Sequence, residues 1–318
     1  MKTAYVFPGQ GAQYVGMGRA LRDAFPVARE AMEEADDALR LSLSKLFLEG
    51  PEDELRLTYY TQPAILTVSI ACLRVLRSLV IGLEPAVVAG HSLGEYSALV
   101  AAGALSFSDA LRLVHLRGRL MDAAVPAGQG SMAAVLGADQ AALERLCQEV
   151  SQEGGPVEVA NVNCPGQLVI SGAAEAVAIV SRRIGETGAR RAIPLGVSGP
   201  FHSSLMLSAG DRLAETLARV DVRDANPPVV ANVHARPVDR AADIRKALAQ
   251  QVARPVLWEA SVNTMADLGV NAFLELGPGS VLSGLIRKTI KNARVLHAED
   301  PVTMAAVVDQ LTDGERFA

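Results

Sequence analysis

The sequence predicts an α/β protein in which helices cover a mostly parallel sheet, with a smaller second sheet inserted in the chain. Of the 318 residues, 50% are apolar but only 4% are aromatic, so the core must consist mainly of Ala, Val, Leu and Ile. This composition suits helices packed on a parallel sheet. Short apolar runs alternate with longer helical stretches, and the alternation changes near residue 128.

In the first part of the chain, glycine-containing loops follow short buried strands. A strand over 4–7 ends at Pro8-Gly9-Gln10-Gly11, and a strand over 85–89 leads into Gly90–Gly94. Helices are expected over 62–80, from Gly94 to about 102, and over 109–124. The apolar stretch 64–83 carries two arginines, so it predicts a core helix and not a membrane span. The first residues lack the pattern of a signal peptide.

Residues 128–197 have a different pattern. They predict a strand over 131–136, a helix over 139–152, strands over 157–161 and 167–171, a helix over 174–186 and a strand over 191–197. This β-α-β-β-α-β order is that of the ferredoxin-like split unit. We therefore expect a large domain formed by 1–127 and 198–318, with further strands at 228–232 and 272–276, and an inserted subdomain at 128–197.

Charge and cysteine content exclude several classes of protein. The net charge is −5, which gives no basic footprint for nucleic acid. The three cysteines, Cys72, Cys147 and Cys164, are far apart and form no CxxC pair. They predict buried thiols in a reducing cytoplasm, with no disulfide framework and no metal site.

The segment Gly90-His91-Ser92-Leu93-Gly94 has the pattern of a nucleophile elbow. In such an elbow, a sharp strand-to-helix turn exposes the serine hydroxyl, and the start of the helix presents free N–H groups to a developing oxyanion. A bare GxSxG can also be a simple glycine-bounded turn. The strand before it and the helix after it favour Ser92 as a nucleophile.

A serine nucleophile needs a base, and the chain has five histidines: His91, His115, His202, His234 and His297. His91 adjoins the serine and should point away from it, and His115 lies on a polar helix face where we expect it to be solvated. His202 lies in a Gly-Pro loop after a strand and is the best candidate base. A loop histidine is often structural, so the residues alone leave this assignment open.

One arginine interrupts an apolar helix face. On the 109–124 helix, Arg117 lies in the middle of a stripe formed by Ala110, Leu113, Val114, Leu120, Met121 and Ala124. An inward guanidinium keeps its charge and must be paired. It could form an ion pair with a buried Asp or Glu, or a bidentate fork for a substrate carboxylate. The second alternative predicts a dicarboxylic acyl group such as malonyl.

Five motifs in order carry a family resemblance: Phe7-Pro8-Gly9-Gln10-Gly11, Gly90-His91-Ser92-Leu93-Gly94-Glu95-Tyr96, Leu116-Arg117-Gly118, Pro200-Phe201-His202-Ser203 and Glu275-Leu276-Gly277-Pro278-Gly279. Together they resemble malonyl-CoA:acyl carrier protein transacylases, the discrete acyltransferases of bacterial fatty-acid and polyketide synthesis. The resemblance extends from residue 3 to about 310. It implies an α/β-hydrolase-like large domain that carries a ferredoxin-like subdomain. Gly199 departs from the alanine that relatives often have.

The resemblance also implies a role for each matching residue. Ser92 would be acylated, His202 would be its base, and the backbone carbonyl of Gln251 would orient that histidine. Arg117 would hold the malonyl carboxylate.

The backbone N–H groups of Gln10 and Leu93 would form the oxyanion hole. The implied reaction is a ping-pong transfer of malonyl from malonyl-CoA to the phosphopantetheine thiol of an acyl carrier protein. It requires no metal or redox cofactor.

The carrier protein is expected to be acidic, and two basic clusters are candidates to receive it. One is Arg190-Arg191; the other, the late-helix cluster, is Arg287-Lys288 with Lys291 and Arg294. Solvated helix faces are an equally good interpretation of both. We expect a cytoplasmic monomer.

Several alternatives remain open on the sequence alone: a trans-acting polyketide synthase acyltransferase, a transacylase associated with malonate decarboxylase, a serine thioesterase, and a non-catalytic scaffold subunit. A thioesterase would share the elbow but would not need Arg117. An intact Ser92, His202 and Arg117 argue against a scaffold subunit.

Overall fold

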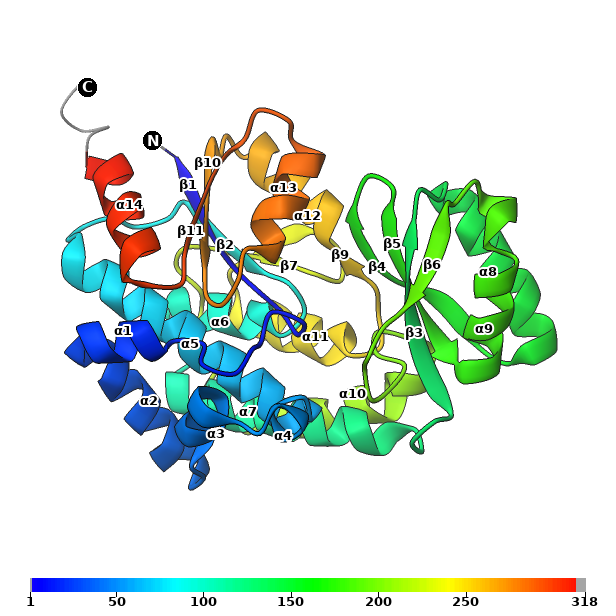
Figure 1. The fold of residues 1–318 in the computed structure, drawn as a ribbon, viewed down its shortest axis with the longest axis horizontal. Helices are drawn as coiled ribbons and strands as arrows, with labels where there is room; N and C mark the ends of the chain where they lie inside the picture. The colour runs from blue at the N-terminus through cyan, green and yellow to red at the C-terminus, as the bar shows by residue number, and fades with distance from the viewer. Residues whose placement is uncertain (1, 313–318) are drawn as a thin grey trace.

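The computed structural model of the chain describes residues 2–312, which form a mixed α/β fold with two sheets (Figure 1). The larger sheet has the strand order β11-β10-β1-β2-β7-β8. Its strands are β1 (Thr3–Phe7), β2 (Val87–Gly90), β7 (Val229–Ala231), β8 (Arg236–Val238), β10 (Ala272–Leu276) and β11 (Arg294–Ala298). All neighbouring strands of this sheet pair in parallel except β8, which runs antiparallel to β7. The predicted fold class is therefore confirmed as a mixed α/β fold with one mostly parallel sheet.

The larger sheet is covered on both faces. Along β1, Tyr5 and Phe7 belong to one apolar cluster, whereas Ala4 and Val6 belong to a second cluster on the opposite face. Successive side chains of a strand point to opposite faces, so an unbroken apolar run is what a strand between two helical layers requires. The short apolar runs of the sequence are explained by this two-sided burial.

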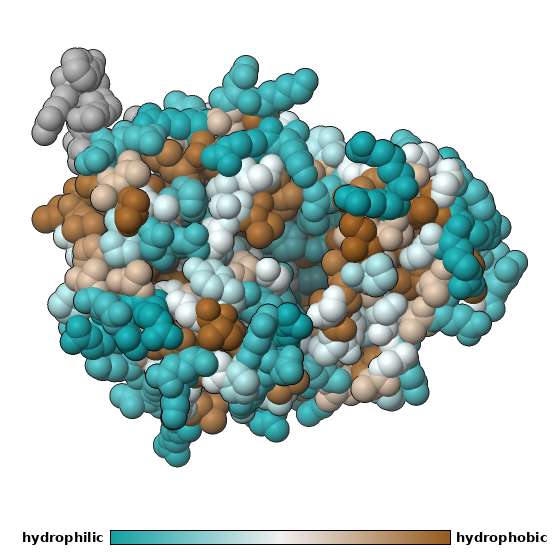
Figure 2. Space-filling view, in the orientation of Figure 1, coloured by the Kyte–Doolittle hydropathy of each residue, from teal (hydrophilic) through white to brown (hydrophobic). Residues whose placement is uncertain are grey.

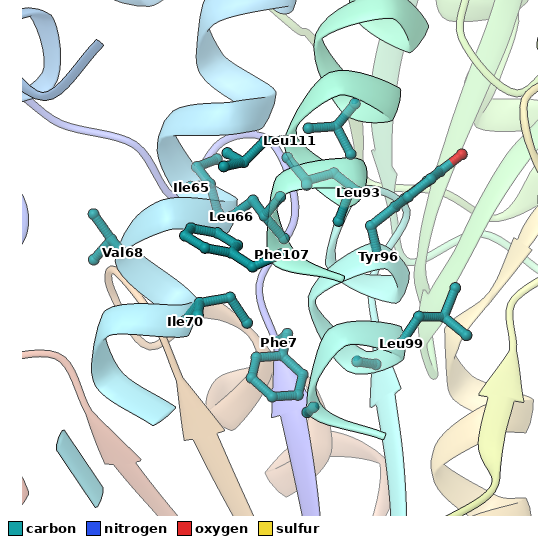
Figure 3. Packing of buried hydrophobic residues seen from close by; sticks show 14 of the residues in the cluster. Phe7, Ile65, Leu66, Val68, Ile70, Leu93, Tyr96, Leu99, Phe107 and Leu111 are labelled. Carbon is teal, nitrogen blue, oxygen red and sulfur yellow. The ribbon is translucent and has the colours of Figure 1, made fainter. Parts of the chain in front are cut away.

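Twelve helices within residues 2–312 surround this sheet or extend from it. They are α1 (Arg19–Ala24), α2 (Pro26–Leu39), α3 (Leu43–Glu49), α4 (Glu52–Leu55), α5 (Thr58–Leu79), α6 (Gly94–Ala101), α7 (Phe107–Ala124), α10 (Leu207–Leu217), α11 (Ala241–Gln251), α12 (Trp258–Asp267), α13 (Val281–Thr289) and α14 (Pro301–Thr312). Figure 3 shows part of the main core, where side chains of α5, α6 and α7 pack around Phe7.

The helix α5 runs through the centre of this core. It is long and apolar enough to cross a membrane by length and composition, but 78% of its most apolar window is buried inside the protein. The prediction of a core helix is confirmed.

Pro63 lies inside α5 and cannot donate a hydrogen bond to Tyr59, four residues earlier. The freed carbonyl oxygen of Tyr59 instead lies 2.8 Å from Nδ1 of His115. The prediction of a solvated His115 is therefore wrong, because this half-buried ring replaces a missing helical donor.

The smaller sheet forms a second lobe, at the right of Figure 1. Its strand order is β6-β3-β5-β4-β9, with β3 (Gly130–Leu136), β4 (Val157–Cys164), β5 (Gln167–Ala173), β6 (Arg191–Pro194) and β9 (Val256–Leu257). Helices α8 (Gln140–Gly154) and α9 (Ala174–Arg182) pack on it through an apolar cluster of their own. The predicted β-α-β-β-α-β order is confirmed, although the last helix and strand are shorter than expected.

One strand of the smaller sheet comes from outside the predicted insertion. β9 pairs in parallel with β4, through the registers Asn161 to Val256 and Val162 to Leu257. β9 is not predictable from the sequence, because a two-residue strand is too short to show a period. The two lobes are thus joined by backbone hydrogen bonds as well as by the chain connections.

The close packing of α5 against α7 depends on a glycine. A Cβ atom at Gly118 would lie 2.5 Å from the Cα atom of Tyr59, which is shorter than any tolerable contact. We expect Gly118→Ala to push the two helices apart and to lower the free energy of unfolding by about 1–3 kcal/mol. Urea-induced unfolding followed by circular dichroism measures this loss.

Gly284 in α13 provides the matched control, because a Cβ atom there meets no heavy atom within 4 Å. Gly284→Ala should leave the free energy of unfolding unchanged or raise it by up to about 1 kcal/mol, since alanine favours a helix. Equal stability of the two variants would contradict the tight contact between α5 and α7.

Candidate active site

Ser92 lies on a sharp turn between β2 and α6, as the sequence predicts. Its φ angle is 50°, in the left-handed region that a non-glycine residue rarely adopts. The flanking glycines make room for this turn: a Cβ at Gly90 would lie 1.9 Å from the carbonyl carbon of Gly94, and one at Gly94 would lie 2.1 Å from the oxygen of Phe7. The pattern of two glycines around Ser92 is therefore a steric requirement of this fold.

An asparagine holds the strained turn in place. Asn232 directly follows β7, and its Oδ1 accepts the backbone N–H of Ser92 at 2.7 Å. Its Nδ2 donates to the backbone oxygen of Gly90 at 2.7 Å. Because β2 and β7 are parallel neighbours, the carboxyl ends of both strands reach the same edge of the sheet. Asn232 therefore bridges both sides of the serine.

The structure brings His202 to the serine. Its Nε2 lies 2.7 Å from Ser92 Oγ, and its Nδ1 lies 2.8 Å from the backbone oxygen of Gln251. A carbonyl oxygen can only accept, so Nδ1 carries the proton and Nε2 is left to accept the serine hydroxyl. This is the hydrogen-bond pattern of a nucleophile and its base, with a main-chain carbonyl as the orienting group.

The environment of His202 keeps its ring neutral. Burial, followed by the positive charge of Arg117, lowers the pKa of His202 to about 3. The neutral imidazole, which alone can take a proton from the serine, is therefore the form present at neutral pH.

Arg117 is 1% exposed, and its guanidinium points into the site. Nη1 donates to Gln62 Oε1 at 2.8 Å, and Nη2 donates to Ser92 Oγ at 2.9 Å and to Gln251 Oε1 at 3.0 Å. Within residues 2–312 no carboxylate lies within ion-pair distance of this guanidinium, and its Nε has no hydrogen-bond partner. The sequence raised two alternatives for Arg117, and the first of them, a structural ion pair, is not found among these residues.

Among the backbone amides near the nucleophile, those of Gln10 and Leu93 have no protein acceptor within the described part of the chain. Phe7 pairs with Gly90, so the loop after β1 runs beside the elbow. A Cβ at Gly9 would lie 2.4 Å from the backbone oxygen of His91, which shows how closely the two segments approach. The fold thus places both predicted oxyanion amides on adjoining segments.

A cleft between the two lobes leads to this edge of the sheet, and Figure 2 shows the hollow. One cavity of about 430 Å³ is lined by Gln10 and Tyr14 of the large lobe and by Leu195 at the edge of the small one. A second, of about 210 Å³, contains His91 and Asn163 in its wall. His91 Nε2 lies 2.8 Å from Asn163 Oδ1, so its ring points away from the serine hydroxyl, as predicted.

Three polar residues of the site were missed by sequence reasoning: Asn232, Gln62 and Glu95. Each is almost fully buried. The signal for Asn232 was its position at the end of a strand parallel to the nucleophile strand. The signal for Gln62 and Glu95 was a polar side chain near the start of a helix that continues as an apolar run.

The prediction of buried thiols is confirmed. Cys72, Cys147 and Cys164 are buried and unpaired.

Comparison with known proteins agrees with this geometry. Residues 4–316 match the acyl transferase domain family. The chain is 49% identical over 312 residues to the malonyl CoA-acyl carrier protein transacylase of Bacillus subtilis, covering 98% of both chains. It is 44% identical over 306 residues to the enzyme of the same name from Escherichia coli K12, covering 96% of this chain and 98% of the relative.

Solved structures give the same result. An acyl carrier protein S-malonyltransferase from Vibrio cholerae superimposes with a TM-score of 0.93 at 43% identity, over 96% of this chain and all of that one. A malonyl-transacylase solved in complex with its type II polyketide synthase acyl carrier protein superimposes with a TM-score of 0.95 at 42% identity, over 98% of this chain and all of that one. The chain belongs to the malonyl CoA-acyl carrier protein transacylase family.

Proposed function

We propose that Ser92, His202 and Arg117 carry out the reaction of this family, the transfer of a malonyl group from malonyl-CoA to an acyl carrier protein. The observation that carries the proposal is the double contact of Ser92 Oγ, which lies 2.7 Å from His202 Nε2 and 2.9 Å from Arg117 Nη2. The first contact supplies a base for the hydroxyl. The second places a permanent cation beside the acyl group that the serine would carry.

In the first half-reaction, Ser92 Oγ attacks the thioester carbon while its proton passes to His202 Nε2. The amides of Gln10 and Leu93 donate to the resulting oxyanion, and each such donor is worth roughly 3 kcal/mol in comparable sites. The carbon–sulfur bond then breaks. The leaving thiolate of CoA takes the proton from His202, and malonyl remains esterified to Ser92.

In the second half-reaction, the phosphopantetheine thiol of the carrier protein gives its proton to His202. Its sulfur attacks the malonyl ester carbon, the bond from that carbon to Ser92 Oγ breaks, and the proton returns to the serine. The main-chain carbonyl of Gln251 fixes the tautomer of the neutral ring and keeps the ring in one orientation through both halves. It accepts from Nδ1–H without itself titrating.

Arg117 selects the acyl group in this proposal. A malonyl carboxylate is separated from the ester carbon by one methylene, so a guanidinium that contacts Ser92 Oγ is within reach of it. The free Nε, and the lack of a carboxylate within ion-pair distance among residues 2–312, support a substrate carboxylate as the missing partner. A thioesterase for neutral acyl groups would gain nothing from a charge buried at this cost.

The two basic clusters are proposed to receive the acidic carrier protein. Arg190 and Arg191 are exposed and lead through β6 to Leu195, which lines both cavities of the cleft. The late-helix cluster is only partly helical, because α13 ends at Thr289, so Lys291 lies beyond it and Arg294 begins β11. From this cluster, Lys288 Nζ donates to Gln167 Oε1 at 3.2 Å, and Gln167 lines the smaller cavity. Lys288 and the strand that begins at Arg191 therefore each contact a residue that lines the cleft, which supports entry of a phosphopantetheine arm from this side.

We also propose that residues 1–127 and 198–318 form an α/β-hydrolase-like catalytic domain and that 128–197 form a ferredoxin-like subdomain. The six-stranded, mostly parallel sheet and the order β6-β3-β5-β4 support this division. The enzyme is proposed to work as a monomer in the cytoplasm.

Incubation with malonyl-CoA should place one malonyl group on Ser92, because the serine is the covalent carrier. Intact-protein and peptide mass spectrometry measures the adduct, and added carrier protein should discharge it by transfer. Ser92→Ala should abolish the adduct. Rapid hydrolysis without transfer would contradict a transferase and favour a thioesterase.

Arg117→Ala should lower kcat/KM for malonyl-CoA about 10- to 100-fold relative to acetyl-CoA, since hydrogen bonds to a charged group are each worth about 1.5–3 kcal/mol. Steady-state transfer assays with both donors measure the ratio. Arg117→Lys should restore only part of it, because lysine lacks the planar fork. A ratio equal to that of the unaltered enzyme would exclude the carboxylate clamp.

Charge-reversal variants should show which surface binds the carrier protein. Arg190→Glu with Arg191→Glu, or Arg287→Glu with Lys288→Glu, should raise KM for the carrier protein several-fold and leave acylation by malonyl-CoA intact. Arg29→Glu on α2, at the lower left of Figure 1, is the matched control. An unchanged KM in both double variants would remove these clusters as the docking surface.

A further inference from the structure

We propose that Glu95 is a positioning residue, which fixes the side-chain amide of Gln251 so that this one residue serves both the base and the malonyl-binding arginine. The inference rests on the roles proposed above for His202 and Arg117. It extends the site to a buried carboxylate that contacts neither of them directly.

Glu95 lies in the first turn of α6, three residues after the nucleophile, and is only 2% exposed. Its Oε2 accepts two hydrogen bonds, from Gln251 Nε2 at 2.8 Å and from the backbone N–H of Asn232 at 2.9 Å. Both donors are completely buried residues. Glu95 therefore hydrogen-bonds both to Asn232, which holds the serine turn, and to Gln251, which orients the histidine.

The amide of Gln251 is the point where these contacts meet. Its Nε2 donates to Glu95 and to the backbone oxygen of Ser92 at 2.9 Å, while its Oε1 accepts from Arg117 Nη2 at 3.0 Å. An amide nitrogen only donates and an amide oxygen only accepts. Two acceptors on one side and a guanidinium on the other therefore allow a single orientation of this amide.

The main chain of the same residue orients the base, because the backbone oxygen of Gln251 lies 2.8 Å from His202 Nδ1. Gln251 is the last residue of α11. Its carbonyl oxygen therefore has no intrahelical hydrogen bond to hold it. Anchoring of the side chain by Glu95 consequently also limits the movement of the carbonyl that His202 uses.

The electrostatic environment fits this role. Burial raises the pKa of Glu95 to about 7, and the hydrogen bonds from Asn232 and Gln251 and the charge of Arg117 oppose that rise. The neighbours of the carboxylate are thus arranged to use it as an acceptor. Across the bridging amide of Gln251, the positive charge of Arg117 favours the ionised form of Glu95.

The test compares Glu95→Met, which keeps volume but has only a weakly accepting sulfur, with Glu95→Gln, which keeps an acceptor oxygen. Active sites are counted by the malonyl adduct, and kcat/KM is then measured per site for malonyl-CoA and acetyl-CoA. Glu95→Met should lower the malonyl-to-acetyl ratio about tenfold or more, together with the acylation rate. Glu95→Gln should restore most of both.

Glu275 supplies the control for loss of a buried carboxylate. It is fully buried and accepts the backbone N–H groups of Leu282 and Ser283 at 3.0 and 2.7 Å. Glu275→Met should lower the melting temperature but leave the malonyl-to-acetyl ratio of the folded fraction unchanged. An equal shift of the ratio in Glu275→Met would overturn the proposal, because the effect would then be general.

Gln251→Met keeps the main-chain carbonyl and removes the amide, so it should reproduce the loss of selectivity. A Gln251→Met or a folded Glu95→Met enzyme with the wild-type ratio and rate per site would overturn the inference about Glu95. That result is separate from failure of the proposed function, which would appear as a wild-type enzyme without a malonyl adduct on Ser92.

Discussion

The burial of the Arg117 guanidinium is the constraint on which the rest of the site depends. A cation in the core of α7 must be given polar partners, and the fold provides neutral ones from two other helices, Gln62 of α5 and Gln251 of α11. A protein carboxylate in direct contact would have stabilised the empty enzyme more strongly, but it would also have occupied the position that a substrate carboxylate needs. In the proposed reaction, the strongest interaction of this cation is therefore left for the carboxylate of the acyl group.

The parallel sheet explains how residues far apart in sequence reach this cation. The loops after β1, β2 and β7 leave the same edge, so Gln10, Ser92 and Asn232 gather there. The glycines at 90 and 94 permit the turn, and Asn232 then hydrogen-bonds to both sides of it. Steric room and polar anchoring together hold the serine in a conformation that its own backbone disfavours.

Much of this arrangement follows from local patterns. The nucleophile turn, the parallel strands, the β-α-β-β-α-β segment and the inward direction of Arg117 are all readable as periodicity or glycine spacing. The pairing of His202 with Ser92 is not, because it depends on contacts 110 residues apart, and only the family resemblance selected that histidine. The buried amides and Glu95 escaped prediction for the same reason. A polar residue inside an apolar helix shows that a partner exists but not which one.

The strand β9 limits how the small lobe can be removed or exchanged. The small lobe is not a continuous segment of the chain, since Val256 and Leu257, from beyond the predicted insertion, add the last strand to its sheet. Excising the segment between residues 128 and 197 would strip that strand of its neighbour, five residues beyond the glutamine that orients the base. Swapping the small lobe between relatives would therefore require the β9 segment to be exchanged with it.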